Sequence, residues 1–275
     1  MGKNGFVGFG NMGSTMLMAL LKARAIPEDD VVVFTRTKEK LKRFITDYPK
    51  VEVARSISDL GRRCKRVFIC TGTIEVKAVL TELSACLPAD AHVITIAGTL
   101  EMRCLESIFE GRISKIMPTM IYEVGEGVTL VCHNRKVLPE DKEFIHIAFS
   151  KIGSVKEIRE EQFDLAADLT SCAPAFYSAI LNNLVQVARR HDDFTVDELN
   201  KLVLPTFYGT AKLLLKTGAD YDGLISRVAT KGGISEEGVK VLDKELPGTF
   251  DELFDKTLGK REMTKKQMRA QYGLE

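Results

Sequence analysis

Short apolar runs rich in β-branched residues alternate with helical stretches over the first 155 residues. The runs occupy residues 5–9, 31–35, 66–71, 92–97, 114–118 and 128–133. Strands that alternate with helices are typical of βαβ units, in which a crossover helix joins two parallel strands. The pattern therefore predicts an α/β domain with a mostly parallel sheet.

The rest of the chain has the spacing of helices. Residues 173–190 place apolar side chains three and four positions apart, which gives one broad apolar face. A second helix is predicted to begin at Thr195, where T-V-D-E is a capping box. We expect two domains, residues 1–155 with the sheet and residues 156–275 all helical. Long helices of low polarity often pack against another subunit, so residues 173–190 and 199–215 predict a homodimer or a higher homo-oligomer.

The composition narrows the function classes. The chain has 275 residues, of which 45% are hydrophobic and 28% charged, and its formal net charge is +1. These values are ordinary for a globular protein and provide no basic field for nucleic acid. No apolar run approaches the roughly 18 residues of a membrane span. The first strand begins too early to leave room for a signal peptide. We expect neither a nucleic-acid partner nor a membrane partner.

Six cysteines and four histidines are scattered through the chain. The cysteines form no C-x-x-C pair and share no metal-ligand spacing with the histidines. Free thiols of this kind suit a reducing compartment. The sequence therefore predicts a cytoplasmic protein without a metal site.

The segment after the first strand has the pattern G-x-G-x-x-G. An apolar strand precedes it and a good helix follows it. In this context the glycines permit a tight turn and let a pyrophosphate approach the helix N-terminus. The candidate dinucleotide-binding residues are Gly8, Gly10, Asn11, Met12 and Gly13. The alternative is a plain glycine-rich turn between a strand and a helix.

The end of the second strand indicates which dinucleotide binds. Sheets that bind NAD usually place an acidic residue there, where it holds the ribose 2′-hydroxyl. This strand ends instead with Thr35 and Arg36, and Lys38 follows. Arginine makes planar, charge-assisted contacts to phosphate, which favours NADP(H). The alternative is that Arg36 and Lys38 are solvated charges at a helix start.

A glycine pair interrupts the helical half of the chain. Gly232 and Gly233 precede Ile234 and Ser235, where a new helix is predicted to begin. Glycines that only end a helix usually occur singly. A glycine pair at a helix start can expose N–H groups to an anion. The plain alternative is that Ser235 is an N-cap that bonds its own helix.

These segments together resemble the pyrroline-5-carboxylate reductases, over nearly the whole chain. The resemblance is carried by GFVGFGNMG, VFTRT, ITIAGT, IMPTMIYEVGEGVT, EEQFDLAADLTSCAPAFY and VATKGGISEEGVKVL. It implies a Rossmann domain that binds NADP(H) and a helical domain that interlocks two subunits. It also implies an NADPH-dependent oxidoreductase that reduces 1-pyrroline-5-carboxylate, a cyclic imine carboxylate, to L-proline in proline biosynthesis.

The resemblance also assigns further candidate site residues. Those near the cofactor are Cys70, Thr71, Gly72, Ala97 and Gly98. Those near the substrate are Thr230, Gly232, Gly233, Ile234 and Ser235. We expect the N–H groups of residues 233–235 to hold the substrate carboxylate, and the hydroxyl of Ser235, as the catalytic residue, to bond the ring nitrogen. Glu236 and Glu237 would repel that carboxylate, so their side chains are expected to point away.

The chain departs from the family pattern near both predicted sites. The family's V-K-P turn is replaced by C-T-G-T at residues 70–73, and Ile57 stands at the place of a polar Asn. The family's G-S-G-P-A becomes S-C-A-P-A at residues 171–175, and a threonine of the C-terminal signature becomes Ser235. These changes indicate a divergent member or a paralogue with an altered substrate.

Other functions stay open at this point. A β-hydroxyacid dehydrogenase generally has a catalytic lysine on the first helix of its second domain, whereas the helix predicted at residues 173–190 contains no lysine. A second possibility is an NADP-binding regulator or scaffold without catalysis, which the altered turn and the lost glycines leave open. A reductase of a different imine or of a hydroxyacid is a third.

Overall fold

The computed structural model describes residues 2–274 and divides the chain into two compact units. The first unit runs to Pro174 and also includes the chain from Thr257 onward. The second unit is Ala175–Lys256.

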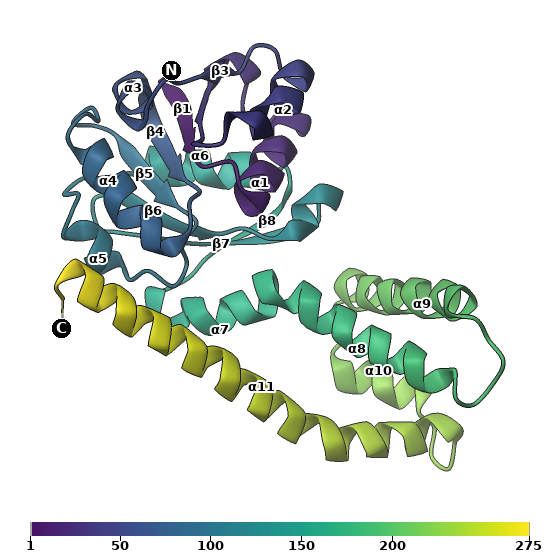
Figure 1. The fold of residues 1–275 in the computed structure, drawn as a ribbon. Coiled ribbons are helices and arrows are strands. Elements are labelled where there is room, and N and C mark those ends of the chain that lie inside the picture. The colour runs from purple at the N-terminus through teal and green to yellow at the C-terminus, as the bar shows by residue number, and fades with distance from the viewer. Residues whose placement is uncertain (1, 275) are drawn as a thin grey trace. The chain divides into compact units, whose positions relative to one another are not determined.

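A single sheet forms the centre of the first unit (Figure 1). Within the described residues its strand order is β3-β2-β1-β4-β5-β6-β7-β8. Neighbouring strands are parallel except for β6 and β7, which are antiparallel. The strands are β1 Lys3–Val7, β2 Val31–Phe34, β3 Glu52–Val53, β4 Cys64–Ile69, β5 His92–Thr95, β6 Arg112–Met117, β7 Gly127–His133 and β8 Gly153–Glu157. The mostly parallel α/β sheet is confirmed.

Helices cover both faces of this sheet, and each face has its own apolar core. On one face Phe6 stacks on Phe68, with ring centroids 4.5 Å apart, among residues of α1, α2 and α6. On the other face Val67 and Ile69 pack with α3, α4 and α5. These helices are α1 Asn11–Lys22, α2 Leu41–Asp47, α3 Ile57–Arg63, α4 Val76–Ser84, α5 Met102–Glu106 and α6 Pro139–Phe149. Burial on both faces explains why the inner strands are continuous apolar runs.

Shorter helical turns join the larger elements of this unit. They are η1 Glu28–Asp30, η2 Lys38–Lys40, η3 Thr73–Glu75, η4 Met120–Val124 and η5 Glu160–Gln162. The chain then leaves the sheet through α7 Phe163–Ala167 and the π-helix η6 Asp168–Cys172.

The predicted boundary between residues 155 and 156 falls inside β8, and the two compact units are divided elsewhere. Residues that follow this predicted boundary, up to Pro174, still belong to the first unit, and the end of the last helix returns to that unit. There Met268 and Tyr272 are buried in the core that contains α4 and α5. The carboxylate of Asp168, itself 1% exposed, accepts a hydrogen bond from Nε of Arg261 at 3.2 Å. The C-terminal segment is therefore part of the first unit.

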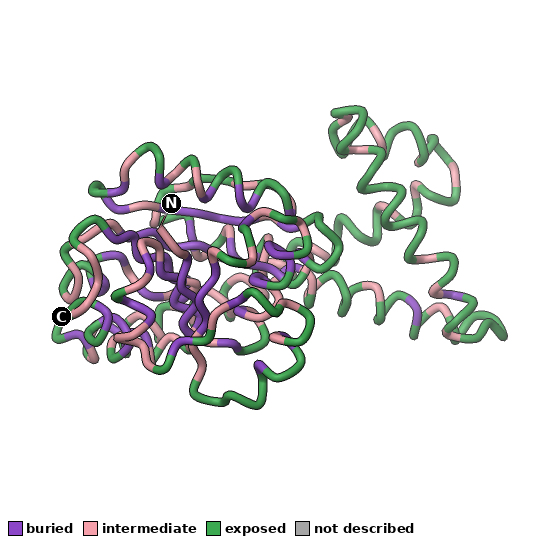
Figure 2. Tube along the Cα trace, turned by 90° about the horizontal axis from the view of Figure 1, so that it is seen from above, coloured by how far each residue is buried: buried purple, intermediate pink, exposed green. Residues whose placement is uncertain are grey.

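The second unit contains most of α8 Ala173–Ala188, all of α9 Val196–Thr217 and α10 Tyr221–Val228, and the part of α11 Ile234–Tyr272 up to Lys256. Thr195 caps α9 in the predicted capping box. Within residues 175–256 only Val185 and Leu199 are buried (Figure 2). The unit taken alone therefore has almost no core of its own. None of the helices within residues 2–274 combines enough length with enough apolar character to span a membrane.

Candidate functional site

The turn from β1 into α1 uses its three glycines in three different ways. Gly8 has φ +102°, and a Cβ there would stand 2.7 Å from the carbonyl oxygen of Cys70. A Cβ at Gly13 would stand 2.8 Å from Cβ of Cys70, so this glycine lets α1 approach β4. A Cβ at Gly10 would meet no atom within 4 Å. Gly10 therefore keeps open space beside the backbone, where a ligand can approach it closely.

The N-terminus of α1 is available to an anion. Its N-cap is Gly10, which has no side chain to bond the first N–H groups. These N–H groups belong to the first turn, which contains Asn11, Met12 and Gly13. Such groups have no partner within a helix and carry the positive end of its dipole. The sequence prediction of a phosphate site fits this geometry.

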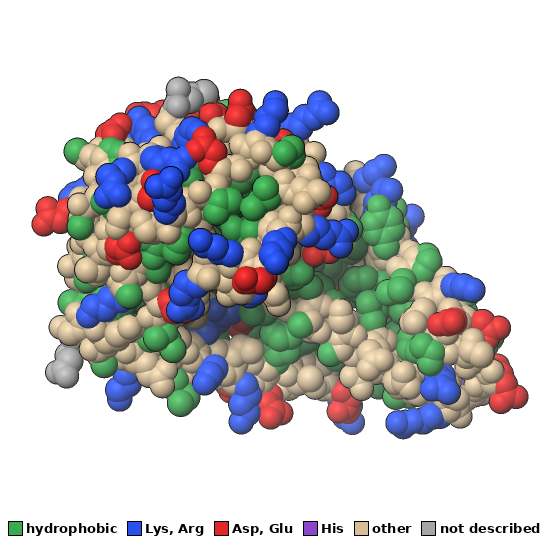
Figure 3. All heavy atoms as spheres, turned by 45° about the horizontal axis from the view of Figure 1, so that its top comes forward, with side chains coloured by type: hydrophobic (Ala, Val, Ile, Leu, Met, Phe, Trp, Pro, Cys, Tyr) green, Lys and Arg blue, Asp and Glu red, His purple; other side chains and the backbone are tan. Residues whose placement is uncertain are grey.

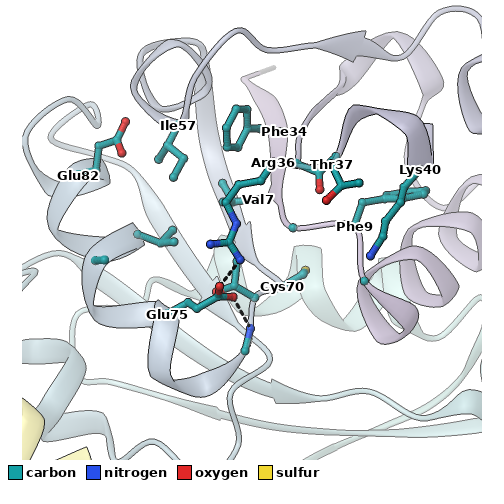
Figure 4. A pocket seen from close by; sticks show the side chains of 17 residues that line it. Val7, Phe9, Phe34, Arg36, Thr37, Lys40, Ile57, Cys70, Glu75 and Glu82 are labelled. Carbon is teal, nitrogen blue, oxygen red and sulfur yellow. Dashed lines mark hydrogen bonds and ion pairs between the residues drawn. The ribbon is translucent and has the colours of Figure 1, made fainter. Parts of the chain in front are cut away.

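A pocket of about 440 Å³ opens between the ends of β1, β2 and β4 (Figure 4). Seven of the predicted cofactor residues line it: Gly8, Gly10, Thr35, Arg36, Cys70, Thr71 and Gly72. They come together because parallel neighbouring strands end at the same edge of a sheet, which is where such folds bind nucleotides.

The remaining predicted cofactor residues do not line this pocket. Asn11, Met12 and Gly13 lie in the first turn of α1. Ala97 and Gly98 follow β5, and a Cβ at Gly98 would stand 2.0 Å from Cε of Met117. The smallness of Gly98 is therefore needed for packing, whereas its cofactor role stays a prediction.

Charged side chains of both signs line the pocket. Nη2 of Arg36 donates a hydrogen bond to Oε1 of Glu75, and the two side chains point toward one another in Figure 4. Oε2 of Glu75 accepts the N–H of Gly72 at 3.2 Å. Lys40 also lines the pocket, whereas Lys38 is not among the lining residues. Arg36 therefore has a carboxylate partner, and its side chain is 81% exposed.

The altered turn after β4 contributes shape more than acid–base chemistry. Cys70 is 6% exposed, and burial raises the pKa of its thiol to about 12. The thiol is neutral near pH 7 and packs as a small apolar group. Oγ1 of Thr71 is buried, and no described residue offers it a hydrogen-bond partner. Thr71 itself lines the pocket.

The predicted substrate loop lies in the second unit and is largely exposed. Gly232 has φ +75°, a left-handed conformation that favours glycine. The N–H of Gly233 donates to the carbonyl oxygen of Thr230 at 2.8 Å, so this one of the three predicted anion-binding N–H groups is already used. α11 begins at Ile234, which makes Ser235 the second residue of the helix and not its N-cap. The N–H groups of Ile234 and Ser235 belong to the first turn of this helix.

One expectation for this loop is wrong. The side chain of Glu236 turns back, and its Oε2 accepts the N–H of Gly232 at 2.6 Å. This hydrogen bond lowers the pKa of the Glu236 carboxyl group. A carboxylate is itself the anion that the exposed N–H groups of such a loop attract. The loop therefore binds an anion in the structure, and that anion is its own side chain.

Comparison with known proteins places this fold in a family. Residues 160–263 match the sequence pattern of the family described as pyrroline-5-carboxylate reductase dimerisation. Residues 3–110 match the sequence pattern of the family described as NAD binding domain of 6-phosphogluconate dehydrogenase. The chain is 33% identical over 268 residues to pyrroline-5-carboxylate reductase 3 of Bacillus subtilis, covering 97% of this chain and 98% of the relative. The chain belongs to the pyrroline-5-carboxylate reductase family.

Solved structures of this reductase family have the same fold. The pyrroline carboxylate reductase of Plasmodium falciparum, solved with NADP bound, matches with a TM-score of 0.82 at 24% identity, covering 97% of each chain. The pyrroline-5-carboxylate reductase of Coxiella burnetii matches with a TM-score of 0.84 at 24% identity, covering 97% of this chain and 98% of that one. The Rossmann-type domain with a helical second part is confirmed.

Sequence reasoning about this reductase-family chain missed several residues that line the pocket. They are Val7, Phe9, Phe34, Thr37, Lys40, Glu75, Ala78, Val79 and Glu82. Phe9 is the first variable position of the glycine pattern, so the pattern itself pointed to it. Glu75 lies 39 residues after Arg36, its partner, and no local pattern connects the two. Ile57, noted as a departure from the family, does line the pocket.

Proposed function

We propose that this protein is an NADPH-dependent reductase of a cyclic imine carboxylate, with 1-pyrroline-5-carboxylate as substrate and L-proline as product. The observation that carries the proposal is the open space beside Gly10 in a pocket that Arg36 also lines. The chain is also similar over 97% of its length to a pyrroline-5-carboxylate reductase.

The residues present fit a phosphorylated dinucleotide. The N–H groups at the start of α1 suit the pyrophosphate, and Thr35 and Arg36 suit a 2′-phosphate because they follow β2. NADP is bound in the Plasmodium falciparum structure of the same fold. When bound, the cofactor supplies the hydride, so the protein needs no strong acid or base for that step.

The loop at residues 230–235 is proposed to hold the substrate. Free N–H groups at the start of α11 suit the substrate carboxylate, and the exposed hydroxyl of Ser235 suits the ring nitrogen. Glu236 accepts the N–H of Gly232, which neighbours those donors, and a second carboxylate there would be repelled, so we expect Glu236 to turn away when substrate binds. Substrate binding by this loop is therefore proposed to displace the carboxylate of Glu236.

Two chains are proposed to associate through the second unit. Apolar side chains recur along one face of α8 and remain exposed: Tyr177, Ile180, Leu184 and Val187. Figure 3 shows hydrophobic side chains at the surface of this helical region. A patch of this kind on a unit with almost no core indicates a protein interface. The family pattern matched here is itself described as a dimerisation domain.

The cytoplasm is the proposed location. The six cysteines are free, and four of them are buried. Free thiols persist in a reducing compartment, which supports this assignment.

One assay tests the proposed activity against its rivals. Purified protein is mixed with NADPH, and oxidation is followed by the loss of absorbance of the reduced nicotinamide. We expect oxidation only after 1-pyrroline-5-carboxylate is added, with proline as the product. Cofactor binding without turnover on this or related imines would support a regulator or scaffold. Turnover of a hydroxyacid with NADP⁺ alone would support a dehydrogenase, which the absence of lysine in α8 disfavours.

A further inference from the structure

The pocket holds an acidic residue beside Arg36, the residue predicted to select the cofactor. Arg36 follows β2, and the end of this strand is where such folds contact the ribose 2′ position. Glu75 ends η3, which follows β4, and its carboxylate is the hydrogen-bonding partner of Arg36 (Figure 4). The strand order β2-β1-β4 brings these two segments to the same edge of the sheet. The site therefore combines a cation and a carboxylate.

We propose that Glu75 sets how strongly this site prefers NADPH over NADH. This inference rests on the proposed function. Sites for NAD use a carboxylate to hold the ribose 2′-hydroxyl, and β2 ends without one. Glu75 supplies that carboxylate from a different segment of the chain.

The chemistry of the two cofactors gives Glu75 opposite effects on them. An ionised carboxylate is only an acceptor, so it can take a hydrogen bond from a 2′-hydroxyl. A 2′-phosphate is negatively charged like Glu75, so Glu75 repels it. The phosphate can bind Arg36 only if it replaces Glu75 as the partner of Arg36. The side chain of Arg36 is 81% exposed and that of Glu75 is 39% exposed. An ion pair this exposed is weak, so either cofactor can rearrange it at small cost.

The other acidic residue of the pocket does not compete for Arg36. Oε1 of Glu82 accepts hydrogen bonds from the hydroxyl of Ser58 at 2.7 Å and from its N–H at 3.1 Å. Its charge is thereby held at the start of α3. Selectivity is therefore assigned to Glu75 and not to the summed acidity of the pocket.

The test is the substitution Glu75→Gln in the full chain. Glutamine keeps an oxygen for the N–H of Gly72, so the turn is preserved while the charge is removed. Dissociation constants for NADPH and NADH are measured from cofactor fluorescence, and those for 2′,5′-ADP and 5′-ADP by calorimetry. We expect NADPH and 2′,5′-ADP to bind about three- to tenfold more tightly and NADH to bind more weakly.

Two controls separate this effect from a general change of charge. Glu39→Gln removes a nearby negative charge that does not line the pocket. The ratio of the dissociation constants for NADPH and NADH should stay within twofold of the ratio in the unmodified protein. In an Arg36→Ala background, Glu75→Gln should still strengthen NADPH binding, because Glu75 repels the 2′-phosphate directly. Loss of the effect in that background, or an effect of equal size with Glu39→Gln, would overturn the inference.

The same measurements distinguish two kinds of failure. If neither dinucleotide binds to the unmodified protein, the proposed function itself is wrong. If both bind but Glu75→Gln leaves their ratio unchanged, the cofactor proposal stands and the role assigned to Glu75 is wrong.

Discussion

The N–H of Gly232 donates to the carboxylate of Glu236 at 2.6 Å, so the loop proposed to bind substrate already holds an anion. Gly232 can present its N–H this way because its φ of +75° suits glycine. The two groups are four residues apart at the start of α11. Any incoming carboxylate therefore competes with a side chain of the loop itself.

This competition predicts an effect of Glu236→Gln on substrate affinity. Glutamine can still accept the N–H of Gly232, but it brings no charge to the loop. The KM for the imine carboxylate should fall about two- to fivefold, as expected for one charge near a helix N-terminus. The kcat should change little. Steady-state kinetics with saturating NADPH measure both, and Glu237→Gln is the matched control because no described contact joins Glu237 to the glycine pair. A raised KM would contradict the competition.

Ser235→Ala tests the catalytic hydroxyl. Because Ser235 is the second residue of α11 and not its N-cap, the substitution should leave the melting temperature nearly unchanged. Loss of the hydrogen bond to the ring nitrogen should lower kcat/KM about 5- to 150-fold. Affinity for NADPH should stay the same, and Ser235→Thr should retain activity.

Kinetics and thermal melts are measured on the same Ser235→Ala preparation. A lowered melt with unchanged kinetics would show that the hydroxyl is only structural. Gly233→Val should reduce activity further, because a Cβ at this position would stand 2.9 Å from the carbonyl oxygen of Thr230.

Arg36→Ala tests the phosphate contact directly. A charge-assisted hydrogen bond contributes about 1.5–3 kcal/mol, so NADPH should bind about 10- to 150-fold more weakly. NADH has no 2′-phosphate, and its affinity should change by less than threefold. Cofactor fluorescence measures both constants. An equal loss for the two cofactors would show that the substitution damages the pocket in general.

The association of two chains is tested on α8. Ile180, Leu184 and Val187 lie on one helical face and are 42%, 55% and 44% exposed in the single chain. Leu184→Glu would place a charge inside the proposed interface, which should weaken association at least about 100-fold. Light scattering at micromolar concentration should show a dimer or larger species for the unmodified protein and a monomer for the variant. Ile147→Glu changes an exposed apolar residue of α6 and should leave the assembly intact.

Strong local patterns in the sequence predicted most of the sheet, and weak ones were missed. The six predicted strands all occur because their apolar runs are buried on both faces. β3 has only two residues, Glu52 and Val53, and is too short to form a pattern. β8 reads GSVKE and has no buried residue, since it lies at the edge of the sheet. The end of α11 is largely charged, and its packing depends on two side chains, Met268 and Tyr272.

The site was predictable where one short segment performs one task. The glycine turn is of this kind. A Cβ added at Gly8 or Gly13 would clash with Cys70, whereas one at Gly10 would have open space around it, as the pattern predicts. The pairing of Arg36 with Glu75 depends on strand order, which no spacing in the sequence reveals. The turning of Glu236 onto Gly232 depends on rotamer choice within one helical turn, and charge repulsion alone suggested the opposite.

A buried polar chain across β5, β6 and β7 predicts loss of stability in acid. Nε2 of His92 lies 2.6 Å from Oγ of Ser114, which lies 2.6 Å from Nδ1 of His133. Burial lowers the pKa of His92 to about 3 and that of His133 to about 4. Nearby cations, Arg66 and Arg112, oppose protonation of His92 further.

Both histidines are therefore neutral in the folded protein at a pH where the unfolded chain is protonated. Because the unfolded state binds more protons below pH 6.5, the free energy of unfolding falls as the pH falls from 6.5 toward the folded pKa values. Between pH 7 and pH 5 each histidine should remove about 2 kcal/mol of stability. Equilibrium urea unfolding at fixed chain concentration measures this slope. His92→Gln should reduce the slope of the unfolding free energy against pH by the amount that one bound proton contributes. His191→Gln, at an exposed position, should leave this slope unchanged. An unchanged slope for His92→Gln would show that His92 is protonated in the folded protein and that the buried chain tolerates the charge.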